Sequence, residues 1–200
     1  MAIHRDLASP RVIGLARWVS IVAHPFVTAL VLVAAVESAR LGPAAAARTV
    51  GVVGALFVLP TAILIARQLR RGAWSTVDAS NPRERPVLFL VGGAGLLALL
   101  IYFARSRPGT PLIAGATGVL AMVAVCAAMT PWVKVSLHMA TAALAASVLL
   151  GRAIAIGWLF AALLPLLGWS RVTLGRHRWE EVALGAALGA CTGALIVRFG

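Results

Sequence analysis

The segment Ser170–Val182 reads SRVTLGRHRWEEV and places several ionisable side chains between two apolar stretches. His177 and Glu181 are four residues apart, so on a helix that begins near Arg176 they share a face, and the carboxylate accepts a hydrogen bond from one ring nitrogen. That bond fixes the tautomer of the imidazole and leaves the other nitrogen as a nucleophile or a base. The alternative is a basic interfacial loop in which Glu181 pairs with Arg176 or Arg178 and the histidine faces lipid headgroups.

A row of small residues continues from Glu181 at a spacing of four, through Gly185, Gly189 and Gly193. Small residues on one face of a helix let a neighbouring helix approach closely. We therefore expect a rigid, tightly packed helix to hold the histidine and its carboxylate.

A second polar stretch, KVSLH, runs from Lys134 to His138 at the start of another apolar run. Ser136 and His138 are two residues apart and cannot share a helix face, so they fit best in a first helical turn. Unpaired backbone N–H groups and the helix dipole attract an anion there. The alternative is structural: a snorkelling lysine, an N-cap serine and a structural histidine.

A third polar stretch, DASNPRERP, covers Asp78–Pro86 and ends where an apolar run begins. Pro86 suits the first turn of a helix, and Arg83 and Arg85 are expected at the membrane surface. Arginines that flank a span are also ordinary membrane anchors, so this stretch alone does not indicate a site.

Apolar residues dominate the rest of the chain: 61% of the 200 residues are hydrophobic and 12% are charged. This composition lies outside the range of soluble domains and predicts an all-α integral membrane protein. The net charge of +12 falls in short clusters between apolar runs, so no basic domain remains to bind nucleic acid. Cys126 and Cys191 both fall inside predicted spans and are interpreted as buried thiols.

Stretches of about 17–20 residues without charge mark the predicted spans. They lie near 18–36, 49–66, 87–104, 111–130, 135–150, 153–169 and 182–199. Only Gly151 and Arg152 separate the fifth run from the sixth, and we interpret these runs as two spans joined by a tight turn rather than one bent segment. The predicted fold is thus a polytopic transmembrane helical bundle of six to seven spans.

The first run follows Arg5, Arg11 and Arg17 and is interpreted as an anchor that is retained. We expect one domain over residues 1–200, in which spans within 18–66 precede a core over 78–189 that carries the polar stretches.

Seven spans would place the N-terminus and the loops 67–86, 131–134 and 170–181 on one face of the membrane. Most Lys and Arg residues fall on this face, which the positive-inside rule makes cytoplasmic, but the excess disappears when the polar stretches are set aside. The same count of spans places the three polar stretches on one face of the membrane.

Two histidines, a serine, a carboxylate and several arginines suit phosphoryl transfer through a phosphohistidine, and this set requires no metal.

These residues resemble the type-2 phosphatidic acid phosphatases, or lipid phosphate phosphatases, which are marked by three motifs. The third motif, Ser-Arg-x5-His-x3-Asp, is matched, with Glu for Asp, by Ser170, Arg171, His177 and Glu181. Its common extension, Val-x2-Gly-x3-Gly, is matched by Val182, Gly185 and Gly189. The second motif, Pro-Ser-Gly-His, is reduced to Ser136-Leu137-His138. The first motif, Lys-x6-Arg-Pro, retains Arg85-Pro86 but has Asp78 at the lysine position.

The resemblance implies that His177 is the nucleophile and Glu181 its orienting partner. His138 would be the general acid for the departing alcohol and then the base that activates water. The phosphate-binding residues that it implies are Arg171, Arg85, Ser136 and Ser170, with Lys134 or Arg83 supplying the missing cation.

The resemblance therefore implies an enzyme of the cell membrane, most simply a bacterial inner membrane, that hydrolyses a phosphomonoester or diphosphate on a lipid without a cofactor. Phosphatidate, phosphatidylglycerol phosphate and polyprenyl phosphate or diphosphate fit equally well. One alternative is a catalytically impaired relative that binds lipid headgroups or a partner protein, which Asp78 and the reduced second motif favour. Another is a transporter or haem-binding bundle that uses His24, His138 and His177.

Overall fold

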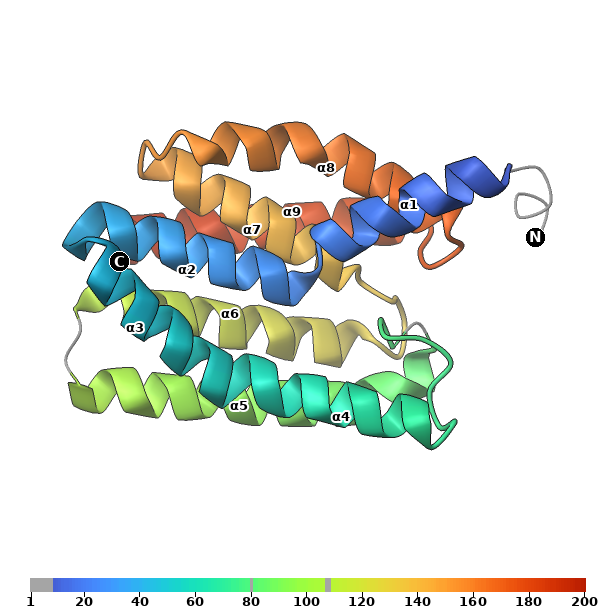
Figure 1. The fold of residues 1–200 in the computed structure, drawn as a ribbon, viewed down its shortest axis with the longest axis horizontal. Helices are drawn as coiled ribbons and strands as arrows, with labels where there is room; N and C mark the ends of the chain where they lie inside the picture. The colour runs from blue at the N-terminus through green and yellow to red at the C-terminus, as the bar shows by residue number, and fades with distance from the viewer. Residues whose placement is uncertain (1–8, 80, 107–108) are drawn as a thin grey trace. The chain divides into compact units, whose positions relative to one another are not determined.

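The computed structural model describes residues 9–79, 81–106 and 109–200, and every regular element within these ranges is a helix. Figure 1 shows α1 (Pro10–Val22), α2 (Pro25–Leu41), α3 (Pro43–Val53), a π-helical segment (Gly54–Val58), α4 (Leu59–Arg70), a 3-10 turn (Pro82–Glu84), α5 (Arg85–Ser106), α6 (Thr110–Met129), α7 (Leu137–Gly151), α8 (Ile156–Thr173) and α9 (Trp179–Phe199). The predicted all-helical class is confirmed for these residues. Arg5 and Ser80 lie outside them.

Among the described residues, five helical segments are long and apolar enough to cross a membrane: Pro43–Arg70, Pro82–Ser106, Thr110–Met129, Ile156–Thr173 and Trp179–Phe199. The bent pair α1 and α2 adds a sixth if it counts as one broken span. The predicted run 135–150 forms α7, which has 15 residues and is shorter than the about 20 that a bilayer requires. The described residues therefore hold five or six candidate spans, where six to seven were predicted, and the chain has the character of a multi-pass membrane protein.

The first predicted run, 18–36, is not one straight helix. It is divided between α1 and α2, which meet at an angle of 43°. Pro25 is the reason, because proline offers no N–H for the helical ladder and disfavours the helical conformation at the residue before it. Ala23 and His24 form the break.

The chain divides into two compact units. The first combines the described residues up to Leu32 with Val135–Ala194. In this unit α8 packs against α7 and against α1, which lies along it in Figure 1. The shared core is apolar and contains Met139, Ala142, Leu167 and Val182, with Val19 and Ala23 packed against it.

The second unit comprises Val33–Lys134 and Leu195–Gly200. Here α3, the π-helical segment and α4 follow one another without a break. The π-helical segment and α4 pack against α5, which also packs against α6. Gly95 of α5 permits the close approach, since a Cβ at this position would lie 2.7 Å from the Leu56 carbonyl oxygen. The prediction of a single domain over residues 1–200 stays a prediction.

The expected close packing of α9 is confirmed within the first unit. A Cβ on Gly185 would lie 2.5 Å from the carbonyl oxygen of Ser136, and a Cβ on Gly189 would overlap the carbonyl of Ala140. A Cβ on Gly193 would lie 2.7 Å from the Cβ of Ser147. The glycine row thus brings α9 into backbone contact with α7.

The predicted division near Gly151 is also confirmed, since α7 ends there and α8 begins at Ile156. Cys126 is buried, as expected, but the interpretation of Cys191 as a buried thiol is wrong. Cys191 is exposed on α9 because it lies off the glycine row that faces α7.

Candidate active site

The C-terminal end of α8 sets the position of His177. Gly175 has a positive φ of 63°, and its N–H donates to the Val172 carbonyl at 2.9 Å. The N–H of Arg176 donates to the Arg171 carbonyl at 3.0 Å, which completes a Schellman ending. The N–H of His177 reaches the same Arg171 carbonyl at 3.3 Å. The Schellman ending of α8 therefore places the backbone of His177 beside that of Arg171, although the two residues are six positions apart in the sequence.

His177 and Glu181 form the predicted hydrogen bond, with 2.9 Å between Nδ1 and Oε2. The helix begins later than expected, at Trp179, so His177 lies just before α9 rather than on it. Since Nδ1 is engaged with the carboxylate, Nε2 is the ring nitrogen that can react with a ligand.

Glu181 has a second task in the first turn of α9. Its Oε2 also accepts a hydrogen bond from the backbone N–H of Arg178 at 3.1 Å, which is the acidic half of a capping box. The side chain of Arg178 pairs instead with Glu180 at 3.2 Å, on the exposed surface. The His177 side chain is only 3% exposed. The alternative of a headgroup-facing histidine is therefore wrong.

Ser136 connects the polar stretch Lys134–His138 to the segment Ser170–Val182. Its backbone N–H donates to the backbone carbonyl of Glu181 at 3.2 Å. Ser136 occupies the N-cap position of α7, as the structural alternative required, but its side chain makes no capping hydrogen bond. The hydroxyl is fully buried and has no hydrogen-bond partner among the described residues. An unsatisfied buried hydroxyl is costly, so a ligand that accepts from it would be favoured.

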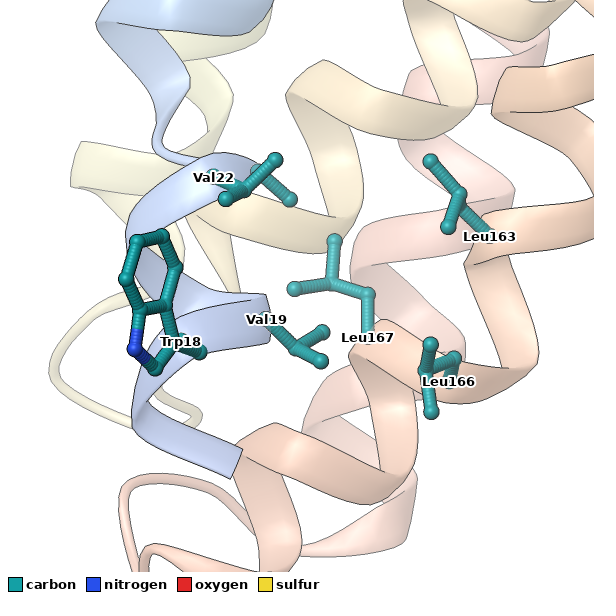
Figure 2. A pocket seen from close by; sticks show the side chains of 7 residues that line it. Trp18, Val19, Val22, Leu163, Leu166 and Leu167 are labelled. Carbon is teal, nitrogen blue, oxygen red and sulfur yellow. The ribbon is translucent and has the colours of Figure 1, made fainter. Parts of the chain in front are cut away.

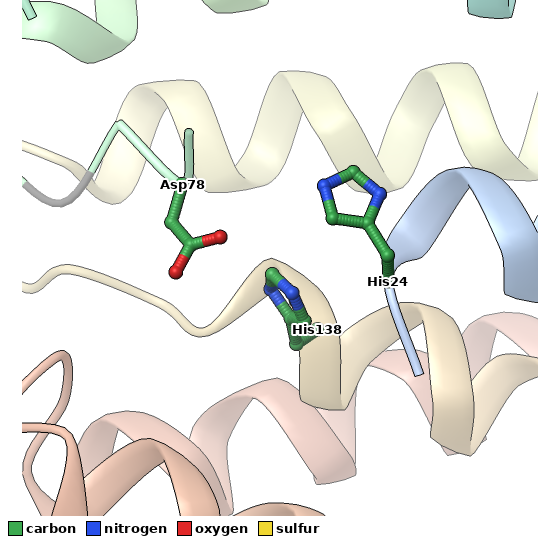
Figure 3. A group of neighbouring side chains, drawn as sticks. All are labelled: His24, Asp78 and His138. Carbon is green, nitrogen blue, oxygen red and sulfur yellow. The ribbon is translucent and has the colours of Figure 1, made fainter. Parts of the chain in front are cut away.

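His138 lies in the first turn of α7, as expected, and is 4% exposed. Its ring meets that of His24 edge to face, with centroids 5.3 Å apart, and Figure 3 shows the two side chains. One of its ring nitrogens donates to the backbone carbonyl of Ser20. Arg171 and His177 are close enough to interact with His138 electrostatically. Two histidines and an arginine are thus gathered in one buried region of the first unit.

Ser170 and Arg171 are both buried at the C-terminal end of α8, where they are tied to α1. The hydroxyl of Ser170 donates to the Ala16 carbonyl at 2.6 Å. Arg171 Nη1 donates to Ser20 Oγ, also at 2.6 Å. Ser170 is therefore engaged with the protein backbone, and Arg171 is a buried cation that Ser20 holds in place.

The other residues of the prediction belong to the second unit. Arg85 is the first residue of α5 and is buried, and Lys134 lies between α6 and α7. Asp78 and Arg83 lie between α4 and α5, where Glu84 accepts a hydrogen bond from the N–H of Ser75. The structure thus brings the second and third motifs together within the first unit, and the residues of the first motif lie in the second.

Sequence reasoning missed the part that α1 plays, since residues 1–70 were expected to add only spans. Ser20 and His24 contact the site residues Arg171 and His138. His24 was a visible signal as an ionisable residue within an apolar run. Ser20 gave no such signal, because single serines are common in helices of membrane proteins.

The first unit therefore presents an oriented imidazole, a second buried imidazole, an arginine and a serine hydroxyl. This set can bind a tetrahedral anion and exchange protons with it. Comparisons of this chain with protein-family models, with curated proteins and with solved structures found no match.

Proposed function

We propose that this chain is a lipid phosphatase that hydrolyses a phosphomonoester or diphosphate through a phosphohistidine. The observation that carries the proposal is the His177–Glu181 hydrogen bond of 2.9 Å, buried beside Arg171 and His138. A carboxylate on Nδ1 makes Nε2 more basic and directs it outward from the pair, as nucleophilic catalysis requires.

In the first step, His177 Nε2 attacks phosphorus and the bond from phosphorus to the lipid oxygen breaks. His138 donates its proton to that oxygen, so the lipid leaves as a neutral alcohol, or as a monophosphate when the substrate is a diphosphate. Arg171 and the hydroxyl of Ser136 hold the phosphoryl oxygens, where charge is spread in the transition state.

In the second step, His138 takes a proton from water as the water oxygen attacks the phosphohistidine. The phosphorus–nitrogen bond breaks, inorganic phosphate leaves, and His177 returns to its first state. The negative charge of the Glu181 carboxylate balances the positive charge that the His177 ring carries while it is phosphorylated. Arg85 and Lys134 are proposed as further phosphate-binding residues from the family resemblance alone.

An apolar groove beside these residues supports a lipid substrate over a soluble one. The groove has a volume of about 200 Å³ and lies between α1 and α8, as Figure 2 shows. It is lined by Trp18, Val19, Val22, Ala23, Leu163, Leu166 and Leu167. In the groove, Val19 adjoins Ser20, and Leu167 lies one helical turn before Arg171. A lipid whose hydrocarbon chain occupies the groove therefore has its headgroup near Ser20 and Arg171. We place this activity in a bacterial inner membrane.

The decisive experiment measures phosphate release by purified protein in detergent, with excess EDTA, from phosphatidate, phosphatidylglycerol phosphate and polyprenyl phosphates. Wild type is compared with His177→Ala and with Arg178→Ala, a matched control whose side chain is exposed. We expect release by wild type and by Arg178→Ala, and loss of at least about a thousandfold for His177→Ala.

Quenching a reaction with a lipid phosphate that carries radiolabelled phosphorus in alkaline denaturant, and then dividing the sample between alkali and acid, tests the intermediate. Label that is stable in alkali, lost in acid and absent from His177→Ala supports the phosphohistidine. A folded wild type that binds anionic lipid but releases no phosphate from any substrate would contradict the proposal and favour the headgroup-binding alternative.

A further inference from the structure

The break between α1 and α2 determines which carbonyl of α1 is available to the site. In a continuous helix the N–H of His24 would donate to the Ser20 carbonyl, four residues earlier. In this chain the N–H of His24 donates to the Ile21 carbonyl at 3.2 Å, and the helix ends. The Ser20 carbonyl is thus one of the last carbonyls of α1, and it accepts the ring N–H of His138 instead.

The side chain of Ser20 contacts a second residue of the candidate site, Arg171. Ser20 Oγ accepts Arg171 Nη1 at 2.6 Å, and Ser20 is only 7% exposed. One residue of α1 therefore contacts, with its two oxygens, a histidine of α7 and an arginine of α8. Ser170 adds a further link between the helices through the Ala16 carbonyl, one turn earlier on α1.

We propose that the C-terminal turn of α1, opened by the break before Pro25, is a positioning element of the active site. The Ser20 carbonyl orients His138, and the Ser20 hydroxyl orients Arg171. This inference rests on the proposed phosphatase function and adds residues to it that the three motifs do not contain.

Three physical effects follow from this arrangement. The hydrogen bond to a carbonyl fixes the tautomer of His138 and directs the opposite ring nitrogen to the leaving oxygen. Burial, and after it Arg171, His24 and His177, lower the pKa of His138 well below its ordinary value. The bond to the Ser20 carbonyl, at the partly negative C-terminal end of α1, acts against this lowering and favours the protonated imidazole that a general acid needs. The hydroxyl holds the guanidinium in one orientation, so less of its rotational freedom is lost when phosphate binds.

Pro25→Ala tests the carbonyl. Alanine is the best helix former and proline the worst, so the variant can extend α1, and the N–H of His24 then takes the Ser20 carbonyl away from His138. A purely structural role predicts an equal or more stable protein with normal turnover. We expect kcat to fall by about a hundredfold with KM for the lipid phosphate within about twofold of wild type. The control is Pro43→Ala, another proline that begins a helix, in the second unit.

Ser20→Ala tests the hydroxyl and leaves the carbonyl in place. We expect KM to rise about tenfold and the affinity for orthovanadate, measured by thermal shift without turnover, to fall by a similar factor. Ser20→Thr, which keeps the hydroxyl, is expected to restore both. Ser147→Ala is the matched control, because the Ser147 hydroxyl also links two helices by a hydrogen bond, which it donates to the Ala190 carbonyl, and neither residue belongs to the proposed site.

The outcomes separate this inference from the proposed function. If wild type hydrolyses lipid phosphates but Pro25→Ala matches Pro43→Ala in kcat, or Ser20→Ala matches Ser147→Ala in KM, the positioning role is overturned and the phosphatase stands. If wild type releases no phosphate while both variants fold, the proposed function itself has failed.

Discussion

The backbone N–H of Ser136 donates to the backbone carbonyl of Glu181 at 3.2 Å, which joins the start of α7 to the first turn of α9. These two residues follow different apolar runs, yet their main chains are in direct contact. Because backbone groups make the bond, the position of His138 relative to His177 does not depend on any one side chain. The glycine row of α9 makes this proximity possible, since Gly185 lies directly over the Ser136 carbonyl.

Glu181→Gln separates charge from geometry. A glutamine oxygen can still accept from the Arg178 N–H and from His177 Nδ1, but it cannot compensate an imidazolium. We expect kcat to fall by about a hundredfold or more while the free energy of unfolding changes by less than about 1 kcal/mol. Initial rates and thermal unfolding in detergent provide the check.

Glu180→Gln is the control for this variant. Glu180 is the neighbouring carboxylate and pairs with the exposed Arg178 side chain. Its loss is expected to leave kcat unchanged, because exposed ion pairs contribute little. Equal rates for the two variants would show that the Glu181 charge plays no part in turnover.

The contacts of the site that are local in the sequence could be predicted. The spacing of four between His177 and Glu181 and the glycine row both encode contacts within one helical segment or along one helix face, and both are present. α9 starts later than predicted, but the contact between His177 and Glu181 is kept, because the Schellman ending at Gly175 turns the chain so that His177 lies next to the first turn of α9.

The contacts that α1 makes with the site could not be predicted from residue spacing. Ser20 and Arg171 are 151 residues apart, and no spacing rule relates them. The bonds to the Ala16 and Ser20 carbonyls leave no signature in side-chain type, because every residue has a carbonyl. Pro25 lies inside the run 18–36 that was predicted as one span, so the break was not predicted, and which carbonyl it exposes depends on the fold.

Ser136→Ala is expected to stabilise the protein and impair it. The hydroxyl is fully buried without a hydrogen-bond partner among the described residues, and removing such a group relieves a cost of about 1 kcal/mol. Loss of one donor to the phosphoryl group should raise KM or lower kcat by about tenfold. Thermal unfolding tests the expected gain in stability, and steady-state kinetics on the same preparation test the expected rise in KM or fall in kcat. A variant that is less stable than wild type would show that the hydroxyl has a structural partner instead.

Gly189→Ala tests the backbone contact between α7 and α9. The added methyl group would overlap the Ala140 carbonyl, so the helices must separate, at a cost of about 1–3 kcal/mol. Gly115→Ala in α6 is the control, because a methyl group there meets nothing within 4 Å and alanine favours the helix. We expect thermal unfolding to occur at a lower temperature for the first variant and at the same or a higher temperature for the second. Equal stability of both would contradict the close packing of α9.

Leu166→Trp tests whether the apolar groove between α1 and α8 holds the hydrocarbon chain of the substrate. Leu166 lines the groove and is 39% exposed, so an indole at this position fills space that a chain would occupy. Displacing about two methylene groups, at about 0.8 kcal/mol each, raises KM for a long-chain lipid phosphate about tenfold. A short-chain phosphate ester that does not reach the groove should keep its KM. Leu159→Trp is the control, since Leu159 lies on the same helix, is 55% exposed and does not line the groove. If Leu166→Trp affects long and short substrates alike, the groove is a lipid-facing surface of the bundle and the chain of the substrate lies elsewhere.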